Sequence, residues 1–357
     1  MSLSSRLRHK AITSSMTMMV TLIASVYSCT AEAQDINDTP PEHRGAGSLN
    51  ITSPIPLAAD VNVHARPHHM KALNSGFDDV KPRITPCGNR LYFSRNFHPG
   101  NVEGALDSED IWYSDFDAAT SSWSEPIHLR GVLNNAGPNY VNNVSATGDT
   151  IILGNQYLKK GKMRAGLSYS VKVDGEWSAP VNIDIHDYYN TSEHENSFVA
   201  LKNGIIISAI ERSEGYGGRD LFVSFWDGVK ATMPMNMGEV INTEFEESSP
   251  FLAADNKTLY FASRGHNGYG GFDIWMTKRL DDSWTNWSTP QNLGPAVNGK
   301  MDDEFFSITN CGKVALFSRQ VNVHNTDLFK ISMEELFKAP ADKNKDTDRQ
   351  STNLASL

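Results

Sequence analysis

One stretch of the chain decides the fold: VINTEFEESSPFLAADNKTLYFASRGHNGYGGFDIWMTKRLDDSWTNWSTPQNL, residues 240–293. It is one copy of a unit that occurs five times, and an asparagine opens each copy about ten residues before an apolar segment. These marker asparagines are Asn74, Asn134, Asn190, Asn242 and Asn298, spaced 60, 56, 52 and 56 residues apart. A nearly fixed period in this range predicts a repeat architecture.

Each unit contains four short segments rich in Tyr, Phe, Ile and Val, and turn residues separate them. In the copy quoted above the segments are SSPFLA, TLYFAS, DIWMTK and WSTPQNL. Such runs, bounded by Gly, Asn and Asp, are typical of antiparallel strands. Four strands per repeat, without a long stretch of helical periodicity, predict the blades of a β-propeller.

The fifth unit ends after its third strand, DLFKIS (327–332), and has no fourth. The segment ITSPIPL (51–57) aligns with WSTPQNL (287–293), so we expect it to supply the outer strand of the last blade and close the ring. A closed ring leaves no exposed strand edge. The predicted fold is therefore an all-β, five-bladed β-propeller of four-stranded antiparallel blades over residues 48–338, with a disordered tail at 339–357.

The series LYFASRG, GYGGFDIW and WSTPQNLG resembles the WD40-like propeller repeats of the TolB type, known from secreted and periplasmic bacterial proteins. The resemblance covers nearly the whole chain after residue 33 and implies a binding scaffold. Such propellers often precede an OmpA-like domain, but only a short polar stretch follows Pro340. We therefore expect a binding module without a cell-wall anchor.

The start of the chain predicts export. A basic region at residues 6–10 precedes apolar residues 16–26, and residues 31–33 fit a small-residue cleavage site. This order is typical of a secretory signal peptide over residues 1–33, followed here by a flexible segment at 34–47, and it predicts a periplasmic or extracellular protein. A rival interpretation is a lipoprotein attached through Cys29. No later segment is long and apolar enough to span a bilayer.

The formal net charge of −10 excludes some classes of partner. An acidic surface disfavours nucleic acid and anionic membranes. The charge does not identify a ligand. We expect a monomer whose partner is a protein or a glycan in the cell envelope or the medium.

Two cysteines, Cys87 and Cys311, occupy the same repeat position in the first and fifth units, which are neighbours in a closed ring. One interpretation is a disulfide that latches the ring in an oxidising compartment. The other is a pair of separate thiols, too far apart for the short reach of a disulfide.

Charged residues recur at three places in most units: acids before the first strand, an arginine after the second, and an aspartate that opens the third. The residues are Asp79, Glu195, Glu247 and Glu304 among the acids, then Arg95, Arg212, Arg264 and Arg319, and finally Asp110, Asp220, Asp273 and Asp327. The second unit lacks all three. Because they vanish together, and because an arginine can bridge two carboxylates, we expect one structural network per blade.

The alternative for these acids is a shared binding site at one mouth of the central channel. Convergent carboxylates there would suit a cation, a basic peptide or a sugar. No metal-binding motif is present, and no DxDxDG spacing supports calcium, so calcium is a candidate cofactor without a motif. His64, His68 and His69 form only a local cluster, which we interpret as a surface loop rather than a metal site.

The same end of the ring should carry the loops between second and third strands. Two GYGG loops place Tyr216 and Tyr269 there, as an exposed aromatic rim suited to carbohydrate or peptide. A plainer interpretation is that these glycines only supply the positive φ of tight turns. The loop of the second unit is basic, with Lys159 and Lys160, and we expect a ligand where the repeat symmetry breaks.

Two classes of function remain, because the chain shows no nucleophile elbow, zinc motif or phosphate loop. The first is a non-catalytic propeller that binds a protein or a glycan on one face. The second is a glycoside hydrolase or polysaccharide lyase, which would need two carboxylates at the channel mouth. Carboxylates without an arginine partner would favour the enzyme, and the candidates are Glu103, Asp107 and Glu109 in the loop of the first unit.

Overall fold

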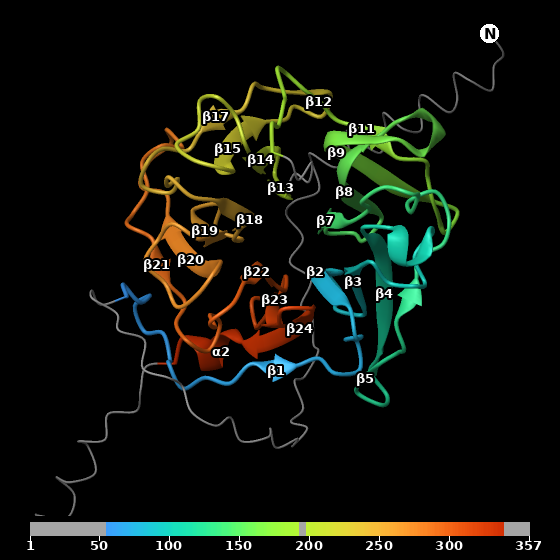
Figure 1. Ribbon diagram of the computed structural model, residues 1–357, viewed down its shortest axis with the longest axis horizontal. Coiled ribbons are helices and arrows are strands. Elements are labelled where there is room, and N and C mark those ends of the chain that lie inside the picture. The colour runs from blue at the N-terminus through green and yellow to red at the C-terminus, as the bar shows by residue number, and fades with distance from the viewer. Residues whose placement is uncertain (1–54, 193–197, 339–357) are drawn as a thin grey trace, which may run out of the picture.

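The computed structural model describes residues 55–192 and 198–338, which form five antiparallel sheets arranged in a ring (Figure 1). The predicted five-bladed propeller is confirmed. The predicted signal peptide, the lipidation candidate Cys29, the tail at 339–357 and the binding candidate Glu195 lie outside the described residues.

In each blade the first strand lies at the centre of the ring and the last at its rim (Figure 1). Blade one contains β2 (Asp78–Ile84), β3 (Arg90–Asn96), β4 (Asp110–Asp117), β5 (Ser122–Trp123) and β6 (Ile127–His128). Blade two contains β7 (Val141–Val144), β8 (Thr150–Tyr157), β9 (Met163–Val173), β10 (Glu176–Trp177) and β11 (Val181–Asn182). Blade three contains β13 (Phe198–Lys202), β14 (Ile205–Ile210), β15 (Asp220–Phe225) and β17 (Met235–Asn236).

Blade four contains β18 (Glu247–Leu252), β19 (Thr258–Ser263), β20 (Asp273–Lys278) and β21 (Gln291–Asn292). Blade five contains β22 (Asp303–Ile308), β23 (Val314–Asn322), β24 (Asn325–Ser332) and, from the other end of the chain, β1 (His68–His69). A parallel pair, β12 (Asp184–Ile185) with β16 (Lys230–Ala231), joins the connection after blade two to blade three. Three short helices, η1 (Gly104–Leu106), η2 (Lys159–Gly161) and α2 (Met333–Leu336), complete the elements of the described ranges.

An N-terminal strand closes the ring as predicted, but it is not the segment that the sequence alignment selected. His68 and His69 pair antiparallel with Lys330 and Phe329 of β24, whereas Leu57 forms a parallel bridge with Asn292 of blade four. The reason lies in PHHM (67–70), which repeats the order of PQNL in WSTPQNL and places His69 where blade four has Asn292. His68 and His69 are exposed, as expected, but they form a strand, so the expectation of a loop is wrong for these two residues. His64 lies in an exposed turn.

Buried apolar side chains gather in the seams between neighbouring blades rather than in one central core. The seam between blades three and four contains Leu221, Phe261 and Trp275, and the next seam contains Phe306 and Phe317. Each side chain of this size stabilises the fold by roughly 2 kcal/mol when it leaves water. Neighbouring blades therefore hold one another by apolar contact.

The marker asparagine ties each connection between blades to the third strand of the preceding blade. Asn242 Oδ1 accepts from the backbone nitrogen of Leu221 (2.8 Å), and Asn242 Nδ2 donates to the Leu221 oxygen (3.0 Å). The same two bonds join Asn134 to Ile111, Asn298 to Ile274 and Asn74 to Leu328. An amide side chain thus takes the place of a paired strand residue. Asn190 differs, because its Oδ1 accepts from the backbone of Glu211 instead (2.9 Å).

The substitution Asn298→Ala tests this role. It leaves the buried backbone nitrogen of Ile274 without its partner, whereas the Ile274 oxygen keeps the bond from the Leu293 nitrogen, so we expect the free energy of unfolding to fall by about 2 kcal/mol. Urea unfolding measures the change. Asn286→Ala, at an exposed asparagine, is the control, with an expected change below about 0.5 kcal/mol. Equal effects of the two substitutions would show that the marker has no special role.

Candidate functional site

One end of the ring carries the connections between second and third strands, and we call it the loop face. The strand register brings the three recurrent charged positions together there, because Asp79 pairs with Arg95 and Arg95 with Asp110. In blade five the corresponding residues, Asp303, Arg319 and Asp327, are likewise opposite one another.

In blades one, four and five the first acid of the set caps a turn. Asp79 accepts from the backbone nitrogen of Ser75 four residues earlier (2.6 Å), and Glu247 and Asp303 accept from Thr243 (2.9 Å) and Gly299 (2.5 Å) in the same way. In blade two the neutral Asn139 accepts equally well, from the backbone nitrogen of Asn135 (2.7 Å). The position therefore requires a hydrogen-bond acceptor and not a negative charge.

The arginines behave differently from blade to blade. Arg95 Nε donates to Asp79 Oδ1 (2.8 Å) and Arg319 Nε to Asp303 Oδ1 (2.7 Å), as the network prediction requires. Arg264 instead donates to Asp302 Oδ2 of the next blade (2.9 Å). Arg212 donates to the backbone oxygen of Asp187 (2.8 Å) and to Glu214 Oε1 (3.0 Å).

The aspartate that opens each third strand belongs to a second network. Its partner is a histidine or asparagine of the fourth strand, at 2.7 Å for Asp110 and His128, 2.7 Å for Asp327 and His69, 3.2 Å for Asp220 and Asn236, and 3.0 Å for Asp273 and Asn292. Three of these aspartates also accept a backbone N–H of the preceding loop, from Val102, Tyr216 and Tyr269. The prediction of a single acid, arginine and aspartate network per blade is therefore wrong.

The two GYGG loops are pressed against the next blade. A Cβ atom on Gly217 would lie 2.3 Å from the backbone carbon of Glu244, and one on Gly270 would lie 2.4 Å from that of Lys300. Neither glycine has a positive φ, so close approach, and not turn conformation, explains both. Of the two predicted rim tyrosines, Tyr216 is 51% exposed, whereas Tyr269 is half-buried and burial raises its pKa.

The first strands carry β-bulges near the channel, in blades one, two, four and five. In three of them the bulge residue has a positive φ: Lys81 (58°), Ser249 (50°) and Phe305 (59°). Bulges re-aim side chains, and they occur often beside functional sites. Here they bring Lys81 Nζ to 4.4 Å from the Tyr140 ring of blade two and 5.3 Å from the Phe305 ring of blade five.

A buried ion pair lies at this junction of three blades. Lys81 Nζ contacts Glu109 Oε1 at 2.5 Å, and both side chains are buried. Burial raises the pKa of Glu109, and the charge of Lys81 acts against that rise. Glu109, which the sequence offers as a carboxylate without an arginine partner, thus has a lysine partner that sequence spacing does not reveal.

The other carboxylates of the blade-one loop differ in exposure. Glu103 is exposed, whereas Asp107 is buried and accepts from the backbone nitrogens of Glu103 and Glu109 (3.4 Å each). Burial, followed by the charge of Asp110, raises the pKa of Asp107 to about 6. Its hydrogen bonds hold the loop together.

Glu304 lies on the bulged segment of blade five and reaches blade four. Its Oε1 accepts from Ser248 Oγ (2.8 Å) and Ser249 Oγ (3.2 Å). Burial raises its pKa, although the side chain stays partly accessible. Its hydrogen bonds among the described residues use Oε1, and the positive charge of Arg219 acts against the rise in its pKa.

The basic loop of blade two and the two cysteines are the other predicted features. Lys159 and Lys160 are exposed on η2, and Arg164 of the same loop donates to Gln156 Oε1. Cys87 and Cys311 are both exposed free thiols and are not joined by a disulfide. Each sulfur contacts a polar group of its own turn, Asn89 Oδ1 and Thr309 Oγ1. Among residues 55–192 and 198–338, no group of three His, Cys, Asp or Glu side chains could hold a metal ion. The same residues contain no helix long and apolar enough to cross a membrane.

Comparisons with known proteins support the fold. No family model matches the chain, and no curated protein matches it. Among solved structures, a glycoside hydrolase is similar over 76% of this chain and 92% of its own, at 8% identity and a TM-score of 0.52. An α-L-arabinofuranosidase from Podospora anserina is similar over 77% and 98%, at 13% identity and a TM-score of 0.47. TolB from Acinetobacter baumannii is similar over 74% and 56%, at 11% identity and a TM-score of 0.42. At these identities the likeness concerns the propeller fold alone, and it does not separate TolB-type propellers from glycoside hydrolases.

Substituting Gly270 by alanine tests the contact between the loop and the next blade. The new methyl group must displace the backbone of Lys300, so we expect a loss of roughly 2 kcal/mol in the free energy of unfolding. Gly76→Ala is the matched control, because no atom lies within 4 Å of its added Cβ. Chemical denaturation of both variants gives the comparison, and a harmless Gly270→Ala would contradict the close approach.

Glu247→Gln tests how ionisation of this buried capping acid lowers the free energy of unfolding. Burial raises the pKa of Glu247 from 4.5 to about 7, so the folded chain retains a proton that the unfolded chain releases between these values. Stability from this residue is therefore present at pH 5 and lost as the pH rises through 7. In the variant we expect the fall in unfolding free energy from pH 5 to pH 8 to shrink by roughly 3 kcal/mol.

Urea unfolding at the two pH values measures this difference. Glu244→Gln, at an exposed position of the same turn, is the control and should keep the wild-type dependence. A parallel dependence in all three proteins would mean that Glu247 is ionised in the folded chain throughout this range.

Proposed function

We propose that this chain is an exported, non-catalytic propeller that binds a partner protein or a glycan on its loop face. One observation carries the proposal. The recurrent first-strand acids are consumed as hydrogen-bond acceptors for turns, and Asn139 does the same work without a charge. Groups fixed in this way are poor candidates for general acid or base catalysis, which requires a carboxyl group within reach of the substrate.

The loop face offers apolar side chains for binding. Tyr216 is 51% exposed and Phe245 is 53% exposed, and they lie on neighbouring segments, because Gly218 N donates to the Phe245 oxygen. Leu106, 88% exposed, is a separate apolar side chain on the loop of blade one. Exposed apolar side chains that gather with polar neighbours are typical of interaction sites. Because the loops are anchored by aspartates and glycines, this surface is formed before a ligand arrives.

A second candidate is a glycoside hydrolase or lyase, and Glu304 favours it. This residue lies on a bulged inner strand, is partly accessible and has a raised pKa, which are properties of a general acid. The similarity in fold to a solved glycoside hydrolase is compatible with this candidate, although a shared fold alone does not imply a shared activity.

A combined binding and product assay separates the two candidates. Thermal shift against a panel of plant and bacterial polysaccharides is followed by detection of new reducing ends or unsaturated sugars in each mixture. We expect stabilisation without products, because a ligand of the folded chain alone raises the melting temperature. The double variant Tyr216→Ala and Phe245→Ala should lose that shift.

Product formation would contradict the binding proposal. If the products disappeared in Glu304→Gln while the thermal shift remained, the enzyme would be established with Glu304 in its chemistry. A panel without any shift would leave a protein as the partner, and the double variant would then be tested for loss of that partner from a purified complex.

A further inference from the structure

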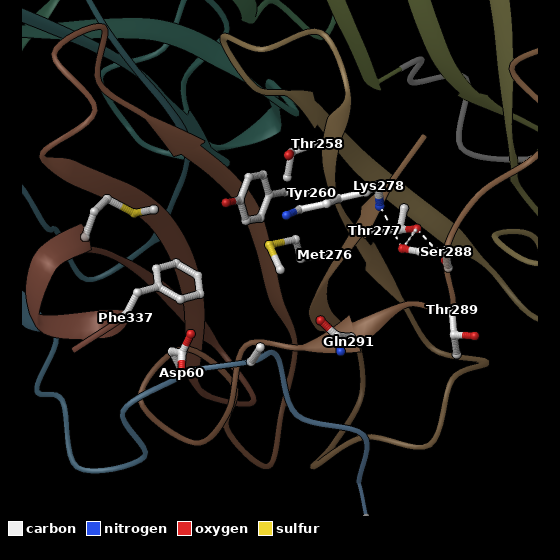
Figure 2. Close-up of a pocket in the computed structure, with 12 residues that line it drawn as sticks. Asp60, Thr258, Tyr260, Met276, Thr277, Lys278, Ser288, Thr289, Gln291 and Phe337 are labelled. Atoms are coloured by element: carbon white, nitrogen blue, oxygen red, sulfur yellow. Dashed lines mark hydrogen bonds between the residues drawn. The ribbon is translucent and has the colours of Figure 1, made fainter. Parts of the chain in front are cut away.

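A hollow lies between blades four and five, with a volume of about 660 Å³ (Figure 2). We call it the seam pocket and define it by Asp60, Tyr260, Met276, Lys278, Gln291 and Phe337. The strand register places it away from the loop face, because Thr258 and Lys278 pair at the end of blade four opposite to Ser263 and Asp273. The pocket is therefore a different surface from the one proposed above.

The floor of the seam pocket is apolar and held in place. The Tyr260 ring packs at 4.9 Å from the Phe306 ring of blade five, and Met276 and Phe337 are half-buried against the same core. Burial raises the pKa of Tyr260 to about 12, so its hydroxyl stays protonated. Figure 2 shows Met276 between Tyr260 and Gln291, with Phe337 at the side of the hollow.

Polar groups of opposite character surround this floor. Asp60 comes from the segment before β1, Lys278 from the end of β20 and Gln291 from β21. No hydrogen bond or ion pair joins these three side chains to any residue of the ranges 55–192 and 198–338. The neighbouring Thr277 and Ser288 differ, because Thr277 Oγ1 donates to the Ser288 oxygen (2.5 Å) (Figure 2). Three chain segments thus present one cation, one anion and one amide to the same hollow.

We propose that the seam pocket binds a neutral sugar residue. Each sugar hydroxyl both donates and accepts, which matches a lining with a carboxylate, an ammonium and an amide. The formal charges of Asp60 and Lys278 cancel. A charged ligand, anionic or cationic, would therefore be repelled by one of these two side chains. The apolar face of a pyranose ring suits Tyr260 and Phe337, and the volume is that of sites for small organic ligands. The inference does not depend on the loop face.

The experiment is a titration of the purified chain with D-galactose, D-xylose, L-arabinose and cellobiose, followed by saturation-transfer NMR. We expect transfer to at least one of them. We expect Lys278→Met to weaken binding about tenfold, since it removes a hydrogen bond to a charged group, and Gln291→Ala to weaken it about fivefold, since it removes a neutral hydrogen bond. Lys313→Met, at an exposed lysine of blade five outside the pocket, should bind like wild type.

Melting curves of the variants verify that they fold. Asp60→Asn, at an exposed position, is a third variant of the pocket. Absence of transfer to all four sugars at tens of millimolar would overturn the proposal. Transfer that survives in Lys278→Met and Gln291→Ala but disappears in Tyr216→Ala would also overturn it, because the sugar would then lie on the loop face. Loss in the pocket variants with retention in Tyr216→Ala supports it, whatever the loop face binds.

Discussion

The fold depends on an amide side chain that replaces a strand. Where each blade ends, the fourth strand is only two residues long in the outer pairs formed by β17, β21 and β1. The marker asparagine then continues the pairing with both its oxygen and its nitrogen, in four of the five connections. The bond to the asparagine oxygen matters most, because the backbone oxygen of the third strand also accepts a backbone N–H from the fourth strand or the residue after it, whereas the buried backbone nitrogen would lose its partner. In these four connections the pairing fixes where the chain leaves one blade for the next.

The regular spacing of this asparagine also explains why the sequence predicts the architecture so well. The period reflects a constraint that each blade must satisfy separately, and it therefore appears in the sequence without knowledge of distant contacts. The strand that closes the ring is harder to predict, since both ITSPIPL and PHHM contain a proline near an apolar residue. What distinguishes them is His69, whose ring nitrogen lies 2.7 Å from Asp327, a contact between positions 258 residues apart.

In the candidate site, the repeat pattern does not predict the contacts of individual side chains. Arg264 sits one residue beyond the position of Arg95 and Arg319 in the register, and this step is enough to turn it toward Asp302 of the next blade. Spacing alone cannot reveal such a change, nor that Lys81 would meet Glu109 through a bulge. The seam pocket could not be predicted from the repeat, because the repeat contains Lys278 and Gln291 but not Asp60, which comes from the N-terminal segment, or Phe337, which follows the last blade.

The pairing of β1 with β24 has a consequence for how the chain reaches its native state. The first strand of the ring finds its partner only when the last blade exists, so contacts between His69 and Phe329 join residues at opposite ends of the propeller. Contacts of such long separation close large loops and slow the folding of β-rich chains. During synthesis the outer edge of the fifth blade cannot exist before residue 332 emerges. Until then β1 remains an unpaired strand, with which a second copy of the chain could pair.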